Sequence, residues 1–154
     1  MSIFHSMNTT ASALTGQRLR MDVISSNIAN IDTTRAKQVD GEWVPYRKKS
    51  VTFKEEPGNF SNFLNVAMGK PVKANVGNGV RVSGIKEDTE TPFKLVYDPT
   101  HPDANAEGYV QHSNVDLLKE MTDLISATRS YEANITVFNA NKSMLTKALE
   151  IGKG

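Results

Sequence analysis

The sequence predicts a mainly α fold with a β insert: two long antiparallel terminal helices forming a coiled-coil-like core, with a small β-rich domain between them. Near both ends, apolar residues recur at alternating steps of three and four, which is typical of helices that pack side by side. Through the middle, Pro and Gly recur between short alternating runs, which is typical of strands joined by turns. We therefore expect an N-terminal core helix in 1–34, a β-rich insert in 35–112 and a C-terminal core helix in 113–154.

The C-terminal segment carries the stronger helical pattern. Its apolar stripe runs from Leu117 to Leu149, and no Pro or Gly lies between Val115 and Ile151. A repeat of 3.5 residues keeps one stripe facing a partner helix. Ser113 followed by Asp116 has the spacing of a capping box and predicts the helix start. Such a helix is roughly 50 Å long, so we expect it to lie against something extended.

The N-terminal segment repeats this pattern more weakly. Its stripe runs from Phe4 to Ile28, and Ser2 is a suitable cap for its first turn. Asx and hydroxyl side chains then follow as far as Thr34, and they compete for backbone hydrogen bonds and end the helix.

Four runs in the insert have the length and alternation of strands: Tyr46–Phe53, Val80–Ile85, Phe93–Tyr97 and Tyr109–Val110. The segment Asn59–Met68 has the spacing of a short helix. If both helices meet this insert at one end, they must run antiparallel and side by side.

A hairpin of two helices would leave apolar side chains in water. Ile3 and Ile24 flank the N-terminal stripe, and Leu118 and Ile125 flank the C-terminal one. Exposed apolar patches of this kind usually mark interfaces. We therefore expect other copies or relatives to cover a self-assembly interface made of Phe4, Met7, Leu14, Met21, Ile28, Leu117, Leu118, Met121, Leu124, Ile125, Tyr131, Ile135, Phe138, Leu145 and Leu149.

The composition excludes several classes of function. The 18 basic and 17 acidic residues give a formal net charge of +1, so nothing favours nucleic acid or an anionic membrane. The absence of cysteine excludes disulfides and thiolate chemistry. No apolar run is long enough to span a membrane, and the first residues lack the features of a cleaved secretory signal.

Two groups of polar residues are candidate chemical sites. Asp98, His101, Asp103 and His112 are possible metal ligands, but their spacing fits no known site and their prolines favour ordinary turns. The basic run 47–49 is interpreted as a strand edge that resists aggregation rather than as a phosphate site. Neither a nucleophile elbow nor a phosphate-binding loop is present, so we predict no enzyme, no cofactor and no small-molecule substrate.

Two stretches contain specific sequence motifs in addition to the periodic pattern of apolar residues. The segment 25–34 reads SSNIANIDTT, and the segment 113–145 contains SNVD, EM, ATRSYEAN and KSML. Together they resemble the flagellar axial proteins of bacteria, which form the rod, the hook and the hook-filament junction. The segment 95–110, with LVYDP and EGYV, is similar to the proximal-rod members. The motif residues are Asn27, Ala29, Asn30, Asp32, Thr33, Asn114, Val115, Glu120, Met121, Arg129, Tyr131, Glu132 and Asn134.

The resemblance implies a structural role. Such proteins leave the cell through the flagellar type III export apparatus without a cleaved signal and polymerise into a tube that crosses the cell envelope. Their terminal helices lie inside the tube, which is the drive shaft that carries torque. The implied partners are other copies of the chain, other rod proteins, the adaptor between membrane ring and rod, and the export apparatus. The segment between Phe53 and Val80 is longer than the family pattern.

Three alternatives stay open at this stage. The first is a different axial protein such as a distal rod subunit. The second is a soluble coiled-coil adaptor, and the third is a hydrolase or metalloenzyme built on the insert. An adaptor forms a discrete dimer or trimer, whereas a rod subunit forms an open helical assembly. Because isolated helices are marginal in water, we expect both ends of a free rod subunit to be mobile until assembly orders them.

Overall fold

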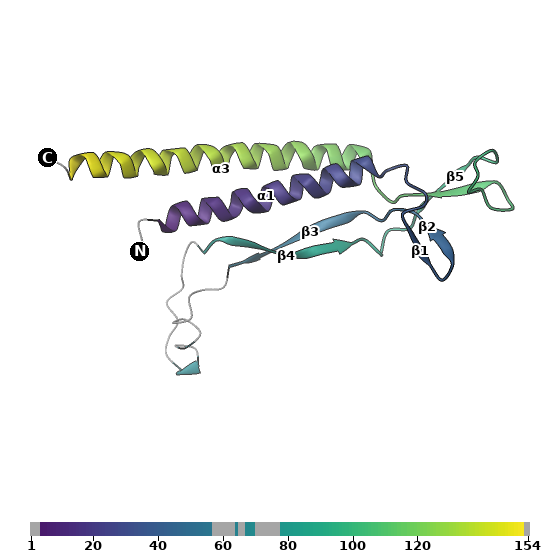
Figure 1. Ribbon diagram of the computed structural model, residues 1–154, viewed down its shortest axis with the longest axis horizontal. Coiled ribbons are helices and arrows are strands. Elements are labelled where there is room, and N and C mark those ends of the chain that lie inside the picture. The colour runs from purple at the N-terminus through teal and green to yellow at the C-terminus, as the bar shows by residue number, and fades with distance from the viewer. Residues whose placement is uncertain (1–3, 57–63, 65–66, 70–77, 153–154) are drawn as a thin grey trace. The chain divides into compact units, whose positions relative to one another are not determined.

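The computed structural model describes residues 4–56, 64, 67–69 and 78–152. A helix lies at each end of this part of the chain, and short strand pairs lie between them (Figure 1). The elements are α1 His5–Ala29, β1 Lys37–Val39, β2 Glu42–Val44, β3 Lys49–Glu55, β4 Val80–Glu87, β5 Lys94–Tyr97, β6 Tyr109–His112 and α3 Leu117–Ile151. The predicted fold class is confirmed to this extent, and coiled-coil pairing stays a prediction. Ser2 and Ile3 lie outside the described residues, as does most of the expected helix Asn59–Met68.

The chain divides into two compact units. Unit 1 comprises Met1–Arg18, Phe53–Ser83 and Thr128–Gly154, and unit 2 comprises Leu19–Thr52 and Gly84–Ala127. None of the helices in the described ranges is both long and apolar enough to cross a membrane.

The hairpin β1–β2 in unit 2 was not predicted from the sequence. Its strands pair antiparallel, with Lys37 opposite Val44 and Val39 opposite Glu42. Asp40 and Gly41 form its turn with φ of 52° and 91°. Asp-Gly is a preferred pair for such turns, because both central residues need positive φ. The signal was therefore present, but the flanking strands are too short to show alternation.

The other strand pairs follow the predicted runs. β5 and β6 pair antiparallel in unit 2, with Lys94 opposite His112 and Tyr97 opposite Tyr109. The rings of Tyr97 and Tyr109 meet edge to face, with centroids 5.3 Å apart. β3 pairs with β4, so the two predicted runs Tyr46–Phe53 and Val80–Ile85 belong to one two-stranded sheet.

The core of unit 2 is small. Its buried apolar residues are Val23, Ile24, Tyr46, Val110, Val115 and Ala127. Ile24 is only 5% exposed, so the expectation that it lies on an uncovered flank is wrong. Val23, Ile24 and Asn27 share one face of α1, and Asn27 contacts both the insert and α3. Lys49 of the insert and Glu120 of α3 therefore both meet this face at Asn27.

The start of α3 differs slightly from the prediction. Asp116 caps the helix, because its Oδ1 accepts hydrogen bonds from the backbone N–H of Leu118 at 3.0 Å and of Lys119 at 3.4 Å. The hydroxyl of Ser113 accepts instead from the N–H of Val115 at 3.2 Å. The helix therefore begins at Leu117, later than the spacing of Ser113 and Asp116 suggests.

Close backbone approach joins α1 to the strands in unit 1. The hydroxyl of Ser12 accepts a hydrogen bond from the N–H of Val80 at 3.0 Å. A Cβ on Gly79 would lie 2.5 Å from that hydroxyl oxygen, and a Cβ on Gly16 would lie 2.9 Å from the ring of Phe53. Small residues at these positions let the helix and the strands pack closely.

Gly79→Ala is therefore expected to lower the free energy of unfolding by about 1–3 kcal/mol, because an added Cβ must displace Ser12. The matched control is Gly84→Ala within β4, the strand that Gly79 precedes, where no atom lies within 4 Å of the new Cβ. Urea unfolding of the purified variants measures both effects. Equal stability of the two variants would contradict the close packing of Gly79 on α1.

Candidate assembly site

The face of α3 that the single chain covers is shifted from the predicted stripe. Leu124, Tyr131, Phe138 and Leu145 are half-buried, and these four belong to the stripe. The other residues on the covered face are small or polar: Glu120, Ala127, Asn134 and Asn141. A stripe drawn through the large apolar residues alone therefore lies to one side of the face of α3 that the chain covers.

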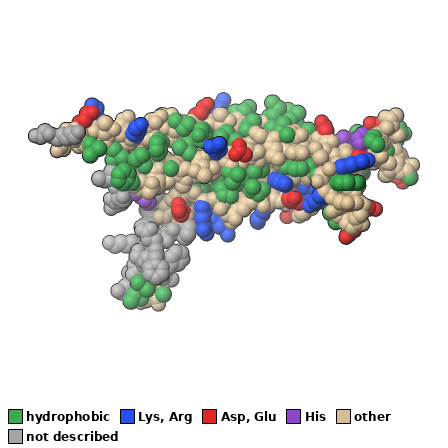
Figure 2. All heavy atoms as spheres, viewed as in Figure 1, with side chains coloured by type: hydrophobic (Ala, Val, Ile, Leu, Met, Phe, Trp, Pro, Cys, Tyr) green, Lys and Arg blue, Asp and Glu red, His purple; other side chains and the backbone are tan. Residues whose placement is uncertain are grey.

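The rest of the expected interface stays in water. On α3, the exposed fractions are 77% for Leu118, 54% for Ile125 and 71% for Leu149. Leu117, Met121, Ile135 and, on α1, Phe4 are also exposed, whereas Met7, Leu14, Met21 and Ile28 are half-buried. Figure 2 shows hydrophobic side chains reaching the surface along the helices. No member of the expected interface is fully buried in the single chain.

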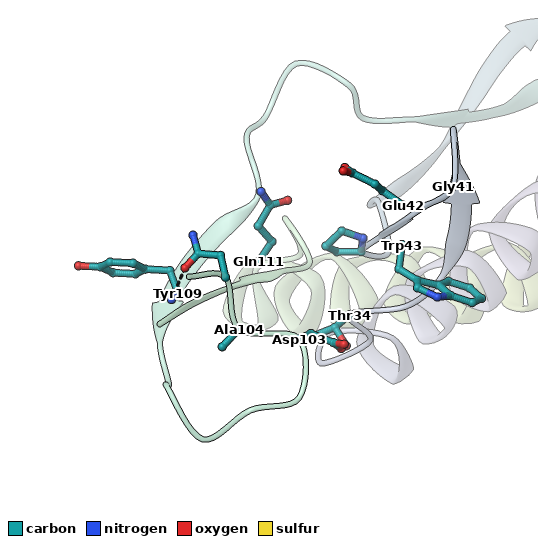
Figure 3. Close-up of a pocket in the computed structure, with 10 residues that line it drawn as sticks. Thr34, Gly41, Glu42, Trp43, Asp103, Ala104, Tyr109 and Gln111 are labelled. Atoms are coloured by element: carbon teal, nitrogen blue, oxygen red, sulfur yellow. Dashed lines mark hydrogen bonds between the residues drawn. The ribbon is translucent and has the colours of Figure 1, made fainter. Parts of the chain in front are cut away.

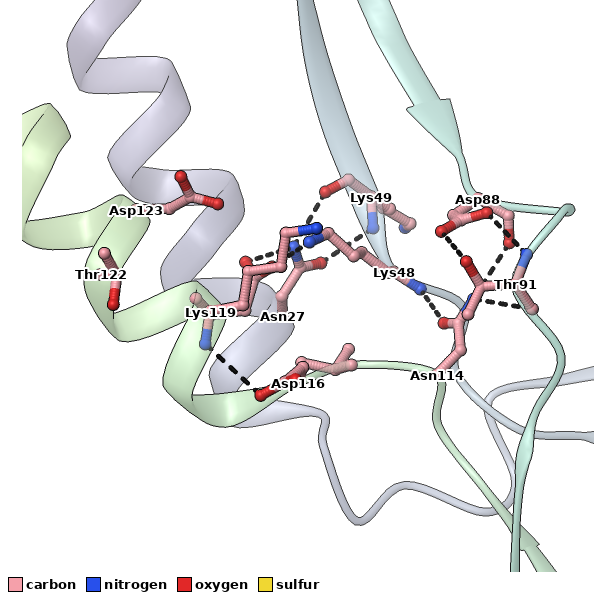
Figure 4. A network of polar contacts seen from close by, with 12 residues as sticks. Asn27, Lys48, Lys49, Asp88, Thr91, Asn114, Asp116, Lys119, Thr122 and Asp123 are labelled. Atoms are coloured by element: carbon pink, nitrogen blue, oxygen red, sulfur yellow. Dashed lines mark hydrogen bonds and ion pairs between the residues drawn. The ribbon is translucent and has the colours of Figure 1, made fainter.

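Asn27 is the centre of a polar network in unit 2 that joins the end of α1 to β3 and to α3 (Figure 4). Its amide nitrogen donates to the carbonyl of Lys49 at 2.8 Å and to Glu120 Oε2 at 2.9 Å. Its amide oxygen accepts from the hydroxyl of Tyr46 at 3.0 Å and from the N–H of Lys49 at 2.9 Å. The side chain is fully buried, and all four of its hydrogen-bonding positions are used.

Glu120 carries the negative charge of this network. Its side chain is 1% exposed, and its Oε1 lies 2.5 Å from the ammonium of Lys48, which is 18% exposed. A second ion pair, between Arg20 of α1 and Asp123 of α3 at 3.3 Å, lies nearer the surface. Asn27 of α1 contacts Glu120 of α3, and the earlier residue Arg20 contacts the later residue Asp123. The two helices therefore run antiparallel within unit 2.

Asn114 extends the network toward the strands. Its oxygen accepts from the N–H of Lys48 at 2.7 Å, and its amide nitrogen donates to the carbonyls of Asp88 and Thr91, each at 3.2 Å. Asp88 in turn accepts from the N–H and the hydroxyl of Thr91, and these bonds hold its pKa below the usual value. Asn27, Asn114 and Glu120 thus tie three separate parts of the sequence together.

The other motif residues have local roles or are exposed. Asn30 donates to the carbonyl of Ser26 and accepts from the hydroxyl of Thr33, which shapes the chain after α1. Val115 is fully buried, and Asn134 donates to the carbonyl of Ser130 along α3. Tyr131 is half-buried, and the remaining motif side chains are exposed: Ala29, Asp32, Met121, Arg129 and Glu132.

The sequence reading missed the partners of this network. Lys48 was assigned to a strand edge in water, whereas its ammonium pairs with buried Glu120. Arg47 lies with its guanidinium 4.3 Å from the centre of the ring of Phe93. The one signal in the sequence was that Arg47 and Lys48 are consecutive, because neighbouring side chains on a strand point to opposite faces and so contact different partners.

Of the four candidate metal ligands, Asp98 and His101 hold a turn, whereas Asp103 binds Thr34 and Arg35 and His112 lies in β6. Asp98 accepts from the N–H of Thr100 at 3.0 Å and from its hydroxyl at 2.7 Å, and these bonds lower the pKa of Asp98. His101 Nδ1 accepts from the N–H of Asp103 at 3.1 Å. The rings of His101 and His112 are 6.4 Å apart. Within the described ranges, no three His, Asp or Glu side chains are grouped as metal ligands would be.

Replacing both His101 and His112 with alanine is expected to leave assembly and motility intact. His101 loses a ring contact, one local hydrogen bond and a 4.0 Å contact with Asp103, and His112 loses the ring contact; such changes cost about 1 kcal/mol or less. Swimming assays and counts of assembled rods test this. Assembly that fails on chelation and returns with zinc would instead support a metal site.

A pocket of about 430 Å³ lies in unit 2 beside the hairpin β1–β2 (Figure 3). Its lining includes exposed Trp43 of β2 and Tyr109 and Gln111 of β6. Asp103 on its wall accepts from Arg35 and from the hydroxyl of Thr34. These two donors, Arg35 first, hold the pKa of Asp103 below the usual value. The contacts fix the loop after β5 to the chain that follows α1.

Comparison with known families identifies the class. Residues 7–37 match the family model described as flagella basal body rod protein, and residues 106–151 match the model described as flagellar basal body rod FlgEFG protein C-terminal. The two matches contain Asn27 and Asn114 with Glu120, so each includes one side of the polar network. Both describe subunits of the flagellar rod.

Whole-length relatives narrow the assignment. The chain is 65% identical to the flagellar basal-body rod protein FlgC of Bacillus subtilis, over 99% of this chain and 100% of the relative. It is 44% identical to FlgC of Borreliella burgdorferi over 100% of both chains, and 39% identical to FlgC of Salmonella typhimurium over 99% of this chain. The chain belongs to the FlgC family of flagellar basal-body rod proteins, which are structural subunits of the flagellum and not an enzyme family.

Proposed function

We propose that this rod subunit assembles through its two terminal helices, which pack against the helices of neighbouring subunits inside the rod. The observation that carries the proposal is the row of large apolar side chains along α3 that the single chain leaves in water. Patches of this kind in soluble proteins usually mark interfaces. Leu118 and Ile125 lie on the face of α3 opposite Glu120 and Ala127, and Ile135 lies at the exposed edge of the covered face, so a neighbour reaches all three without disturbing the fold.

The polar network supports this function by fixing the helices. Asn27 binds Lys49 and Glu120 at once, so the end of α1 and the start of α3 are held to the same strand. A surface that is already positioned loses less conformational entropy when a partner binds. The network therefore supplies the orientation, and the exposed apolar residues supply the interface.

Torque transmission follows from such an assembly. A shaft resists twisting when its contacts are spread over large areas, and long packed helices provide them. We place the helices inside the tube and the strands outside, in a rod that crosses the cell envelope. Other rod proteins and the ring adaptor are the expected neighbours, and the type III apparatus is the expected export route. This role needs neither catalysis nor a cofactor.

Hydrogen exchange on the free chain and on assembled rods tests the proposal. Amides from Phe4 to Ile28 and from Leu118 to Leu149 are expected to exchange faster in the free chain than in the rod. Within α3, residues 117–127 contain its two buried side chains, Glu120 and Ala127, so we expect slower exchange there than in 128–149.

Strong protection along the whole of both helices in a dilute monomer would contradict the expected mobility of the ends, and equal protection in the free chain and in the rod would contradict the proposed helical packing. A discrete dimer or trimer in light scattering, unchanged when rod partners are added, would favour the adaptor alternative.

A further inference from the structure

A basic pocket in unit 2 lies apart from the helical surfaces used in the proposed function. Its wall is formed by the chain after α1, the first residues of β1, the segment before β3 and the end of β4. Four basic residues line it, Arg35, Lys37, Arg47 and Lys49, together with one acid, Glu87. The formal charge of these five side chains is therefore four minus one, or +3.

The cations differ in how they are engaged. Arg35 pairs with Asp103, and Lys37 pairs with Glu87 at 2.9 Å. The pKa of Glu87 is lowered first by its bond from Lys37, with Lys49 and Arg47 adding to the effect. Lys49 has its ammonium 5.4 Å from the centre of the ring of Tyr46, and it pairs with no carboxylate in the described part of the chain. The carboxylate of Glu87 therefore interacts with three cations, and the pocket keeps a net positive charge.

The tip of the hairpin β1–β2 has the opposite character. Asp40 and Glu42 are both exposed there, on either side of Gly41. Neither carboxylate has an ion-pair or hydrogen-bond partner among the residues that the structure describes. The other carboxylates near the pocket are engaged, since Glu87, Asp88 and Asp103 pair with Lys37, Thr91 and Arg35. The turn thus presents two unpaired negative charges on a projecting loop.

From this charge complementarity we propose that the basic pocket of one copy receives the acidic hairpin tip of a second copy. The same chain cannot make this contact, because Lys37 lies on the hairpin itself and the register of β1 with β2 fixes its distance from the turn. Pocket and tip are different patches, so the contact is head to tail. Head-to-tail contacts do not close on a two-fold axis, and they generate rings or helical assemblies. This contact adds to the helical interface and sets the angle between the outer parts of adjacent copies.

Charge exchange tests the proposal in cells that carry only the altered chain. The pocket variant is Lys37→Glu with Lys49→Glu, and the tip variant is Asp40→Asn with Glu42→Lys. Asparagine is chosen at Asp40 because it tolerates positive φ. Each variant alone is expected to give about tenfold fewer complete rods, the effect of losing a close interfacial charge pair.

Two rescues make the test specific. A chain carrying all four substitutions, and an equal mixture of the two variants, should both restore rods, because acid and base again face each other. Folded variants that give no rescue in either experiment would overturn the proposal, and so would a wild-type count of rods with either variant alone. Circular dichroism and urea unfolding of each purified variant establish folding.

Chemical cross-linking of wild-type basal bodies identifies the partner. A carbodiimide joins an ammonium directly to a carboxylate, so a dimer of this chain linked from Lys37 or Lys49 to Asp40 or Glu42 supports the proposal. Links from these lysines to a different rod protein, or none at all, would overturn it. The helical interface is judged separately, because substitutions on α3 should abolish rods whatever the outcome here.

Discussion

Glu120→Ala is expected to lower the free energy of unfolding by about 3–5 kcal/mol, because it leaves the largely buried ammonium of Lys48 without its partner. The amide of Asn27 also loses its acceptor at 2.9 Å. An unpaired buried charge costs more than the intact pair contributes, so the loss exceeds that of an ordinary hydrogen bond. Urea unfolding of the purified chain measures the change. Motility should fall with it, because the helices lose their common anchor.

A double-mutant cycle separates the pair from general packing. Lys48→Ala removes the charge that Glu120→Ala leaves unpaired, so the double variant should be more stable than the sum of the two losses predicts. The matched control is Glu150→Ala, which breaks an exposed Lys–Glu pair of 2.7 Å on the same helix. Exposed pairs contribute about 0.5 kcal/mol or less, so the control should hardly change stability. Additive losses at Lys48 and Glu120 would contradict the ion pair.

The helices and most strands could be predicted because their patterns are local. An unbroken stripe without Pro or Gly predicts α3, and the alternation in Val80–Ile85 predicts β4, each from neighbouring residues alone. The hairpin β1–β2 was missed because its three-residue strands carry no alternation, although Asp40-Gly41 indicated the turn.

The polar network could not be predicted because its contacts are distant in the chain. Asn27 and Glu120 are 93 residues apart, and nothing in either segment says which acceptor a buried amide will find. The resemblance to rod proteins did mark Asn27, Asn114 and Glu120, but it gave them no role. Lys48 was misread because a basic run beside a strand is normally in water. The burial of Ile24 likewise depends on distant parts of the chain, which periodicity within α1 does not report.

Ile135→Asp is expected to abolish rod assembly and motility while leaving the single chain folded. Ile135 is 37% exposed in the single chain, so an aspartate there reaches water and should change the free energy of unfolding by about 1 kcal/mol or less. In the proposed rod the same side chain is covered by a neighbour. A charge buried there without a partner costs several kcal/mol in every subunit contact.

Two controls isolate the interface from the helix. Ile135→Leu keeps an apolar side chain of the same size and should swim normally. Ala133→Asp places the same charge two residues earlier, at an exposed position that points about 160° away around α3. Counts of complete rods, together with circular dichroism of the purified variants, distinguish a failure to assemble from a failure to fold. Wild-type swimming by Ile135→Asp would show that no neighbour covers this face, and the proposed helical interface would then be wrong there.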